Sequence, residues 1–414
     1  MYPLLTGCRA LDLTDEKGYL CGKILADVGV EVIKVEKPGG DHGRRFGPFY
    51  RDVPDPEKSL YWFAYNLNKK GITLDIEKAE GKKIFKKLVE TADFVLESFA
   101  PEYLDNLGLG YAELSKVNKG VILTSISPFG HTGPYKDYKA YDLVVLAMSG
   151  LVYVTGASDR PPVRFTFPQA YLLASAQAAA DAMIAHYYRE RTGEGQHVDT
   201  SAQASFLTTL TNMIPRWELS HIVTHREGSS RMGLFAQADV KSLFRCKDGF
   251  VAFFILGGIS AARTNRALVE WMDSEDMADE YLRSIDWSKF DFATVTQEEI
   301  RKIESYVEKF FLAHTKEEIF GGAKERHIIL QPLLTIPELL HNQQLEAREF
   351  WQKVEHPELG NKVTYPGPFI KSLEVPLSPD HRAPSIGEHN REIYHDWMGF
   401  SMEDIIVLQR EGVI

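Results

Sequence analysis

Lysines beside predicted strands are the first residues in this 414-residue sequence that could do chemistry. Lys37, Lys69 and Lys70 lie in segments that flank strand-like runs, whereas the four lysines between residues 82 and 87 share one helical pattern. Open α/β sheets bind their ligands beyond the carboxyl ends of the strands, and lysine binds phosphate as a point charge. The loop lysines therefore indicate either a phosphate site or an ordinary solvated surface. The helix lysines indicate a solvated face.

One acidic residue, Asp142, is a second candidate. The segment Lys139-Ala140-Tyr141-Asp142 opens an apolar run with helical periodicity. An aspartate in this position stabilises a helix because it opposes the positive end of the helix dipole. The same carboxylate could instead act as an acid in a pocket, and the pattern leaves both interpretations open.

The sequence lacks the common phosphate-loop and metal motifs. No G-x-G-x-x-G follows the first predicted strand, and the glycine-containing segment 192–196 has no P-loop lysine. His221 and His225 are spaced to share a helix face, but they lack the glutamate of H-E-x-x-H and a second group of ligands. We therefore predict no metal site.

The elements that must position these residues alternate between strand and helix. Strand-like runs are separated by helical patterns of 10 to 15 residues, which predicts a mostly parallel, Rossmann-like sheet. The predicted strands cover residues 10–13, 30–35, 71–75, 93–97 and 120–127, and the predicted helices cover 19–28, 79–91, 140–153 and 169–191. A separate α+β module is predicted over 241–325. After Leu330 the chain is predicted to be rich in loops, with a final helix pair near 390–398 and 402–411.

Composition excludes several classes of protein. Hydrophobic residues make up 44% and charged residues 25%, which is ordinary for a globular protein. The net charge of −11 gives no basic footprint for nucleic acid or an anionic membrane. The three cysteines have no C-x-x-C spacing, no signal peptide is evident, and no apolar run reaches membrane-spanning length. We expect a cytoplasmic protein with neither nucleic acid nor membrane as a partner.

Several short motifs occur in a fixed order along almost the whole chain. They are residues 11–14, 25–38, 66–75, 107–111, 125–134 (Ser-Ile-Ser-Pro-Phe-Gly-His-Thr-Gly-Pro), 141–143, 149–151, 192–199 (Thr-Gly-Glu-Gly-Gln-His-Val-Asp), 386–390 and 411–414. Together, and with no single motif decisive, these segments resemble the family III CoA-transferases, also called the CaiB/BaiF family.

The resemblance implies an α/β architecture built from both ends of the chain. Residues 1–205 and 330–414 would form a large Rossmann-like CoA-binding domain, and residues 225–325 a small α+β domain. Residues 206–224 and 326–329 would be linkers. Two such chains would interlock as a dimer.

The resemblance also implies that coenzyme A, or an acyl-CoA, is bound as a substrate without a metal. By motif position, Lys37 and Lys69 would contact the nucleotide phosphates of CoA. Ser98 and Phe99 would line the path of the pantetheine arm, and Lys139 would meet a further phosphate.

The sequence departs from the family at the position of the catalytic nucleophile. The family's chemistry uses an aspartate carboxylate, which forms an anhydride with the acyl group and then a thioester with CoA. Counting from Asp142, or back from residues 192–196, that position falls at Tyr171. A phenol, with a pKa near 10, does not reproduce this cycle.

Three hypotheses follow from the missing carboxylate. In the first, this chain is a subunit of a CoA-transferase, and a homologous partner subunit carries the catalytic aspartate. In the second, the chain is self-sufficient and uses Asp142. In the third, it is an isomerase resembling the 2-methylacyl-CoA racemases. That branch needs a histidine at the position of Tyr141 and an acid near Tyr171, so the third hypothesis is the weakest.

The family includes a two-subunit enzyme of aromatic degradation that transfers CoA from succinyl-CoA to benzylsuccinate. The first hypothesis therefore takes succinyl-CoA and an aromatic dicarboxylate as its candidate substrates. Phe165, Phe167 and Tyr171 could line an aromatic acyl pocket or simply belong to the core.

Overall fold

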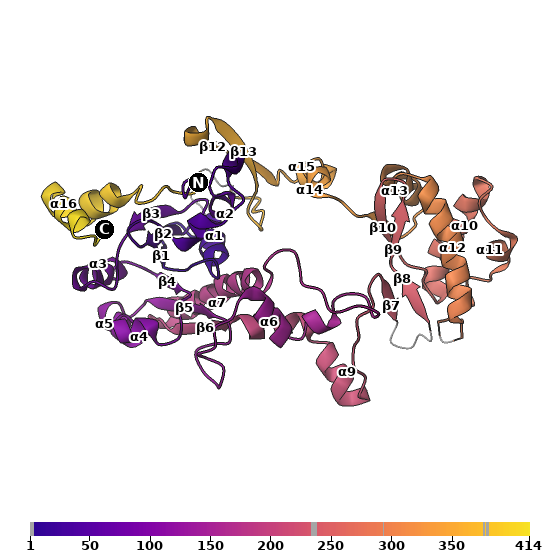
Figure 1. Ribbon diagram of the computed structural model, residues 1–414, viewed down its shortest axis with the longest axis horizontal. Coiled ribbons are helices and arrows are strands. Elements are labelled where there is room, and N and C mark those ends of the chain that lie inside the picture. The colour runs from indigo at the N-terminus through magenta and orange to yellow at the C-terminus, as the bar shows by residue number, and fades with distance from the viewer. Residues whose placement is uncertain (1–3, 233–237, 293, 376, 378–380) are drawn as a thin grey trace. The chain divides into compact units, whose positions relative to one another are not determined.

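The computed structural model describes residues 4–232, 238–292, 294–375, 377 and 381–414 (Figure 1). Its central element is a six-stranded sheet in the order β3-β2-β1-β4-β5-β6, in which every neighbouring pair is parallel. The predicted α/β fold with a parallel sheet is confirmed. The strands are β1 (Arg9–Asp12), β2 (Glu31–Glu36), β3 (Lys70–Thr73), β4 (Phe94–Glu97), β5 (Ile122–Ser127) and β6 (His197–Ser201).

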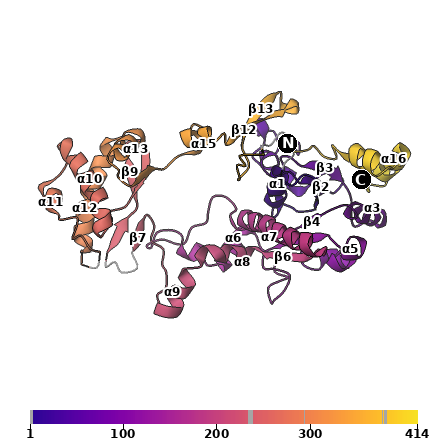
Figure 2. The same cartoon turned by 180° about the vertical axis from the view of Figure 1, so that it is seen from behind.

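Helices cover both faces of this sheet, so its interior strands β4 and β5 are buried along their whole length. Helices α1 (Tyr19–Asp27) and α7 (Ala170–Thr192) pack against each other on one face. Helices α3 (Ala79–Val89), α5 (Tyr111–Val117) and α16 (Met402–Arg410) share an apolar core on the other face (Figures 1 and 2). Shorter helices complete this part of the chain: α2 (Leu60–Tyr65), α4 (Tyr103–Leu107), α6 (Asp142–Met148), α8 (Ala202–Leu207) and α9 (Met213–Ser220).

The long helix α7 lies close to the sheet because its inner face carries small side chains. Ala174, Ala178 and Ala182 recur every four residues and are fully buried. The helix ends at Gly193, whose φ of +77° is a left-handed conformation that glycine adopts without strain. The sequence between Gln169 and Gly193 thus sets both the contact face and the end of the helix.

The C-terminal segment completes the outer edge of strand β3. The side chain of Asn390 accepts a hydrogen bond from the Thr73 amide (2.9 Å) and donates one to the Thr73 hydroxyl (2.8 Å). The hydroxyl of Tyr394, in a π-helix over Arg391–Trp397, donates to the Thr73 carbonyl oxygen (2.7 Å). Edge groups that would otherwise be unpaired are satisfied by residues more than 300 positions away.

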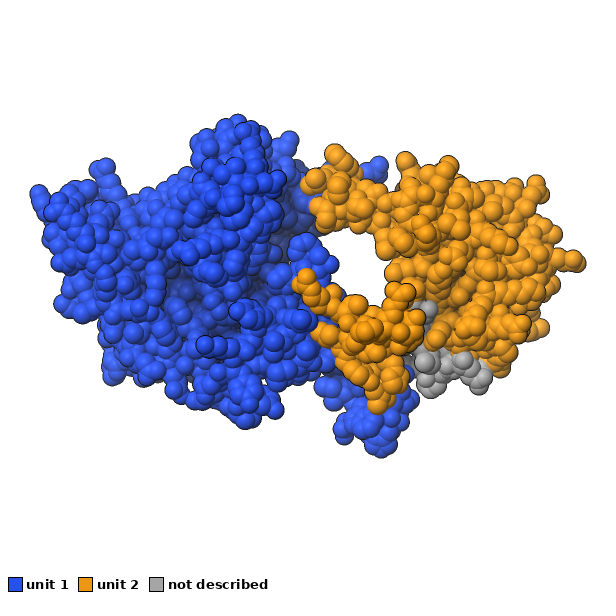
Figure 3. All heavy atoms as spheres, in the orientation of Figure 1, with its two compact units in different colours: residues 1–151, 165–222, 343–414 blue, residues 152–164, 223–342 orange. Residues whose placement is uncertain are grey.

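By its contacts the chain forms two compact units, coloured separately in Figure 3. The first contains residues 1–151, 165–222 and 343–414, and the second contains 152–164 and 223–342. These limits differ from the predicted ones, because residues 206–222 belong to the first unit and 330–342 to the second. Residues 152–164 also join the second unit, although the prediction placed them in the large domain.

The second unit has its own core and a three-stranded antiparallel sheet in the order β11-β10-β9. Its strands β9 and β10 form an antiparallel hairpin across Lys247-Asp248-Gly249, within the region predicted as a separate α+β module. The elements of this unit are β7 (Ser230–Met232), β8 (Asp239–Lys241), β9 (Leu243–Cys246), β10 (Gly249–Phe253), α10 (Ile259–Ser274), α11 (Glu280–Ser284), α12 (Gln297–Ala313), α13 (Lys316–Glu325), β11 (Leu330–Pro332) and α14 (Ile336–Leu339).

The region after residue 342, which was predicted to be rich in loops, contains a β-hairpin. After α15 (Gln343–Ala347), strands β12 (Trp351–His356) and β13 (Asn361–Pro366) form an antiparallel hairpin. Pro357 lies in the turn and Pro366 ends the second strand, so neither proline interrupts the ladder.

Within the described ranges, no helix has the combination of length and apolarity that crossing a membrane requires.

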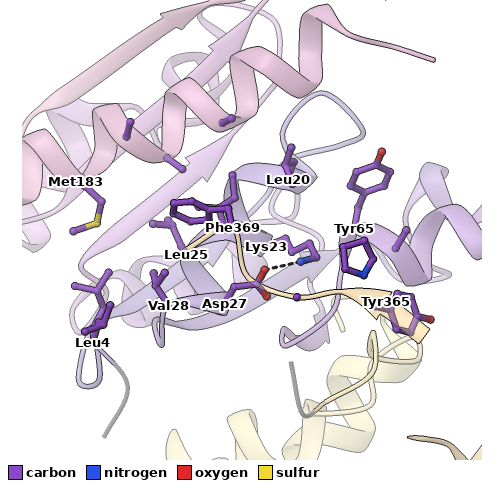
Figure 4. A pocket seen from close by; sticks show the side chains of 18 of the residues that line it. Leu4, Leu20, Lys23, Leu25, Asp27, Val28, Tyr65, Met183, Tyr365 and Phe369 are labelled. Carbon is purple, nitrogen blue, oxygen red and sulfur yellow. Dashed lines mark hydrogen bonds and ion pairs between the residues drawn. The ribbon is translucent and has the colours of Figure 1, made fainter. Parts of the chain in front are cut away.

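A large apolar cavity of about 820 Å³ lies in the first unit, between α1, α7 and the end of β13 (Figure 4). Its wall contains an ion pair between Lys23 and Asp27 (2.5 Å), and the Asp27 carboxylate also accepts a hydrogen bond from Asn68 (3.0 Å). Burial raises the pKa of Asp27, although Lys23 and Asn68 act in the opposite direction. The pair is therefore a buried charge site rather than a surface contact.

Replacing Lys23 by methionine should destabilise the protein by about 2 kcal/mol, because it leaves the Asp27 carboxylate without its counter-charge. Protonation of Asp27, together with the retained Asn68 bond, limits the loss. Urea unfolding measures the difference. The matched control is Lys83→Met, which breaks an exposed pair with Glu80 and should change stability by less than about 0.5 kcal/mol. Equal effects of the two substitutions would contradict the assignment.

Candidate functional site

The candidate site lies at the carboxyl ends of strands β1, β2 and β4, where loops from several strands meet. A cavity of about 310 Å³ is lined there by residues from four separate segments of the chain. Its polar and aromatic lining consists of Asp15, Lys37, Asp41, His42, Arg45, Phe99 and Tyr103. In a parallel α/β sheet this edge is where ligands bind.

Two predicted residues, Lys37 and Phe99, both line this cavity. The Lys37 side chain is 56% exposed and forms an ion pair with Glu77 (2.8 Å). The ring of Phe99 packs against that of Tyr103, with centroids 4.5 Å apart. The structure thus brings together a solvated cation and an aromatic wall, which is a suitable environment for one end of a phosphorylated ligand.

Ser98 lies beside the cavity and organises one of its walls. Its hydroxyl donates to the Asp15 carboxylate (2.7 Å) and accepts from the Asp15 amide (2.8 Å). Ser98 itself is buried. Its contacts hold the loop after β1 against the loop after β4.

Arg45 and His42 also line the cavity, and sequence reasoning missed both. Arg45 is exposed, and no carboxylate among the described residues lies within ion-pairing distance of it. The loop is held by Asp41, which accepts hydrogen bonds from the Gly43 amide (2.8 Å) and the Tyr19 hydroxyl. The sequence signal that could have identified them is the basic segment His42-Gly43-Arg44-Arg45, which follows the predicted strand 30–35 and the glycine pair Gly39-Gly40.

Lys69, which was predicted to contact a nucleotide phosphate of CoA, does not line this cavity. Its side chain is fully buried, and its ammonium donates to Asp12 (2.8 Å), Asn66 (2.9 Å) and the Tyr19 carbonyl oxygen (2.9 Å). All three donors are used inside the protein, which leaves none for a phosphate. Burial alone would raise the pKa of Asp12, but Lys69 and the equally buried Lys34 lower it. Lys69 therefore neutralises a buried carboxylate.

Asp142 and Tyr171 form a connected group at the start of α7. Oδ1 of Asp142 accepts hydrogen bonds from the amides of Ala170 (2.8 Å) and Tyr171 (3.3 Å). The Tyr171 hydroxyl donates to the Ala140 carbonyl oxygen (2.6 Å). Burial, with Asp15, Asp142 and Glu16 nearby, raises the pKa of the Tyr171 phenol. The carboxylate binds a helix N-terminus, and the phenol stays protonated.

The other predicted residues of this region lie on the surface. Lys139 is exposed in the loop just before α6. Phe165 and Phe167 are exposed as well, whereas Tyr171 is 94% buried, so the three differ in environment. Tyr141, the position where a racemase would carry histidine, is also exposed.

Comparison with known proteins extends the resemblance over the full chain. The profile described as CoA-transferase family III matches residues 5–390. The chain is 35% identical over 407 residues to the succinyl-CoA:(R)-benzylsuccinate CoA-transferase subunit BbsE of Thauera aromatica, covering 98% of this chain and 97% of that protein. It is 32% identical over 399 residues to a succinyl-CoA–D-citramalate CoA-transferase of Chloroflexus aurantiacus, covering 96% and 94%.

A solved structure agrees with these relatives. The crystal structure of a CaiB/BaiF family protein from Brucella suis matches with a TM-score of 0.81 and 25% identity, covering 96% of this chain and 100% of that chain. The parallel sheet, the family profile and the full-length relatives lead to one conclusion. This chain belongs to CoA-transferase family III, whose members move CoA between acyl-CoA thioesters and carboxylic acids.

Proposed function

We propose that this chain is the CoA-binding, non-nucleophilic subunit of a two-subunit CoA-transferase, whose homologous partner subunit supplies the catalytic aspartate. The observation that carries this proposal is Tyr171. The residue at the expected nucleophile position has no carboxylate, and its hydroxyl is buried and hydrogen-bonded to a backbone carbonyl. Covalent CoA transfer needs a carboxylate that forms both an anhydride and a thioester.

Asp142 is a poor substitute for the missing nucleophile. Oδ1 of its carboxylate already accepts two amide hydrogen bonds at the start of α7. Hydrogen bonds to an ionised carboxylate stabilise the charge and reduce its tendency to attack a thioester. The self-sufficient enzyme is therefore the second candidate, and the experiments below distinguish it from the first.

The proposed substrates are succinyl-CoA and a dicarboxylic acid such as benzylsuccinate. The relative at 35% identity is named as a subunit of the enzyme for this pair, and succinyl-CoA also appears in the name of the relative at 32% identity. CoA would place its phosphates beside Lys37, Arg45 and Lys139, and part of its length would occupy the cavity at the carboxyl edge of the sheet. We place the reaction in the cytoplasm, with the two subunits interlocked.

Native mass spectrometry of the complex isolated from its source cells tests the subunit assignment. The expected result is this chain together with an unlike, homologous subunit that has aspartate at the position matching Tyr171. A complex that contains only copies of this chain, and that still transfers CoA, would overturn the proposal.

CoA binding should depend on the exposed cations. Replacing Lys37 by alanine should weaken CoA binding about tenfold, because one charge-assisted phosphate contact contributes on the order of 1.4 kcal/mol. The Lys139→Ala variant should show a similar loss, and added salt should reduce the difference from wild type. Isothermal calorimetry measures the affinity.

The control is Lys116→Ala, which removes an exposed lysine that pairs with Glu113 on α5. It should bind CoA like wild type. Unchanged affinity in Lys37→Ala or Lys139→Ala would remove that lysine from the site.

A further inference from the structure

Glu97 is a buried acid that the proposed chemistry does not use. It ends strand β4 and is 2% exposed. Other buried carboxylates near this edge have cationic partners, such as Asp12 with Lys69 and Glu36 with Arg44. No lysine or arginine in the described part of the chain pairs with Glu97, whose nearest basic group is His131 (3.6 Å). A buried acid without a full counter-charge is costly, which points to a specific role.

The contacts of Glu97 are directed at the loop that follows β4. Its Oε2 accepts a hydrogen bond from the Phe99 amide (2.7 Å), and its register partner on β5 is Ser125, whose hydroxyl is hydrogen-bonded to His197 Nε2 (2.8 Å). Its Oε1 faces Nε2 of His131, which is buried and has no hydrogen-bond partner within the described chain. The acid therefore joins the ends of β4 and β5.

The loop held by Glu97 is joined to two parts of the candidate site's lining. Phe99 lines the cavity directly. Ser98, between Phe99 and Glu97, bonds to both the amide and the carboxylate of Asp15, a lining residue from the loop after β1. A change in how Glu97 holds the Phe99 amide would thus act on both Phe99 and Asp15.

We propose that Glu97 is a positioning residue for acyl-CoA binding, and that its ionised carboxylate fixes the Ser98–Phe99 loop in the conformation that accepts CoA. This inference rests on the proposed function, since it assumes that the cavity takes part of CoA. Glu97 itself does not touch the ligand.

Ionisation of Glu97 then links CoA affinity to pH. Burial raises the pKa of Glu97 to about 7, although the Ser125 hydroxyl and the Phe99 amide act in the opposite direction and lower this pKa. Asp15 acts in the same direction as burial and Lys17 in the opposite direction. The other titratable groups on this side are His131, the His197 ring packed against it (5.3 Å) and Asp199, which accepts a hydrogen bond from the His131 amide (2.8 Å).

The test is CoA binding by calorimetry between pH 6 and pH 8, using the full-length chain and its Glu97→Gln variant. Wild-type affinity should rise about fivefold relative to the variant across this range, because a charge-assisted hydrogen bond is about twice as strong as a neutral one. Titration of the CoA phosphates affects both proteins equally. The Glu16→Gln variant is the matched control. Burial beside Asp15 also raises the pKa of Glu16, but within the described residues the Phe99 amide bonds to Glu97 and not to Glu16, so this variant should keep the wild-type profile.

A second measurement needs no variant. Binding of dephospho-CoA at pH 7 in buffers of different ionisation enthalpy should release a fraction of a proton, because binding favours ionised Glu97. No proton release, or the same pH profile in Glu97→Gln as in wild type, would overturn the inference. No CoA binding at any pH would instead overturn the proposed function.

Discussion

The isolated chain is expected to transfer CoA between two carboxylic acids at less than about one thousandth of the rate of its complex with an aspartate-bearing partner. The physical reason is the absent carboxylate. An ester of Tyr171 would not exchange its acyl group with both a carboxylate and the CoA thiolate at similar free energies. The Tyr171 hydroxyl also already donates a hydrogen bond to the Ala140 carbonyl oxygen. Turnover of succinyl-CoA with benzylsuccinate, followed by chromatography of the CoA esters, measures the rate.

Substitutions in each subunit localise the chemistry. Changing the partner's aspartate to asparagine should abolish turnover and the acyl-enzyme adduct that hydroxylamine traps. Tyr171→Phe in this chain should change turnover little and should lower stability by about 1 kcal/mol, because one buried hydrogen bond is lost. Turnover by the isolated chain that disappears in Asp142→Asn would refute the assignment and favour the self-sufficient enzyme.

Glu97→Gln should become progressively more stable than wild type as the pH rises from 4.5 to 7, by about 3 kcal/mol in total. The folded-state pKa of Glu97, about 7, lies above the ordinary value of 4.5. The unfolded chain therefore ionises first, so the protonated acid stabilises the fold below pH 4.5, and this contribution is lost as the pH rises through 7. Urea unfolding at a series of pH values gives the curve.

The control for the Glu97→Gln stability curve is a glutamate in a solvated position. Glu190→Gln replaces an exposed carboxylate near the end of α7 and should give a stability curve parallel to that of wild type. If the Glu97→Gln curve were also parallel to wild type, Glu97 would titrate as an ordinary glutamate and its burial would have no consequence for pH.

Much of the sheet could be predicted from the sequence, because its strands are short apolar runs separated by periodic helices. The prediction of helix 169–191 differs from α7 by one residue at each end, since Gly193 and the alanine repeat are strong local signals. The β12–β13 hairpin was missed because the region after Leu330, which contains Pro357 and Pro366, was predicted to be rich in loops. Which ladder positions tolerate proline depends on pairing that the sequence does not display.

The site was predictable only in part, for a related reason. Lys37 and Lys69 look alike in the sequence, since each lies beside a strand. Only the fold distinguishes a cation in solvent from one bonded to a buried Asp12. Arg45 follows the same strand as Lys37, but Arg44 beside it is buried against Glu36, and the sequence does not indicate which of the two faces the cavity.

The pairing of β3 with the C-terminal segment has a consequence for synthesis on the ribosome. Strand β3 ends at Thr73, and on its outer side the amide and carbonyl of Thr73 bond to Asn390 and Tyr394. The first Rossmann-like strands therefore leave the exit tunnel long before their edge can be closed. During that interval the nascent chain exposes an open strand, the kind of surface that chaperones bind and that pairs wrongly with other chains.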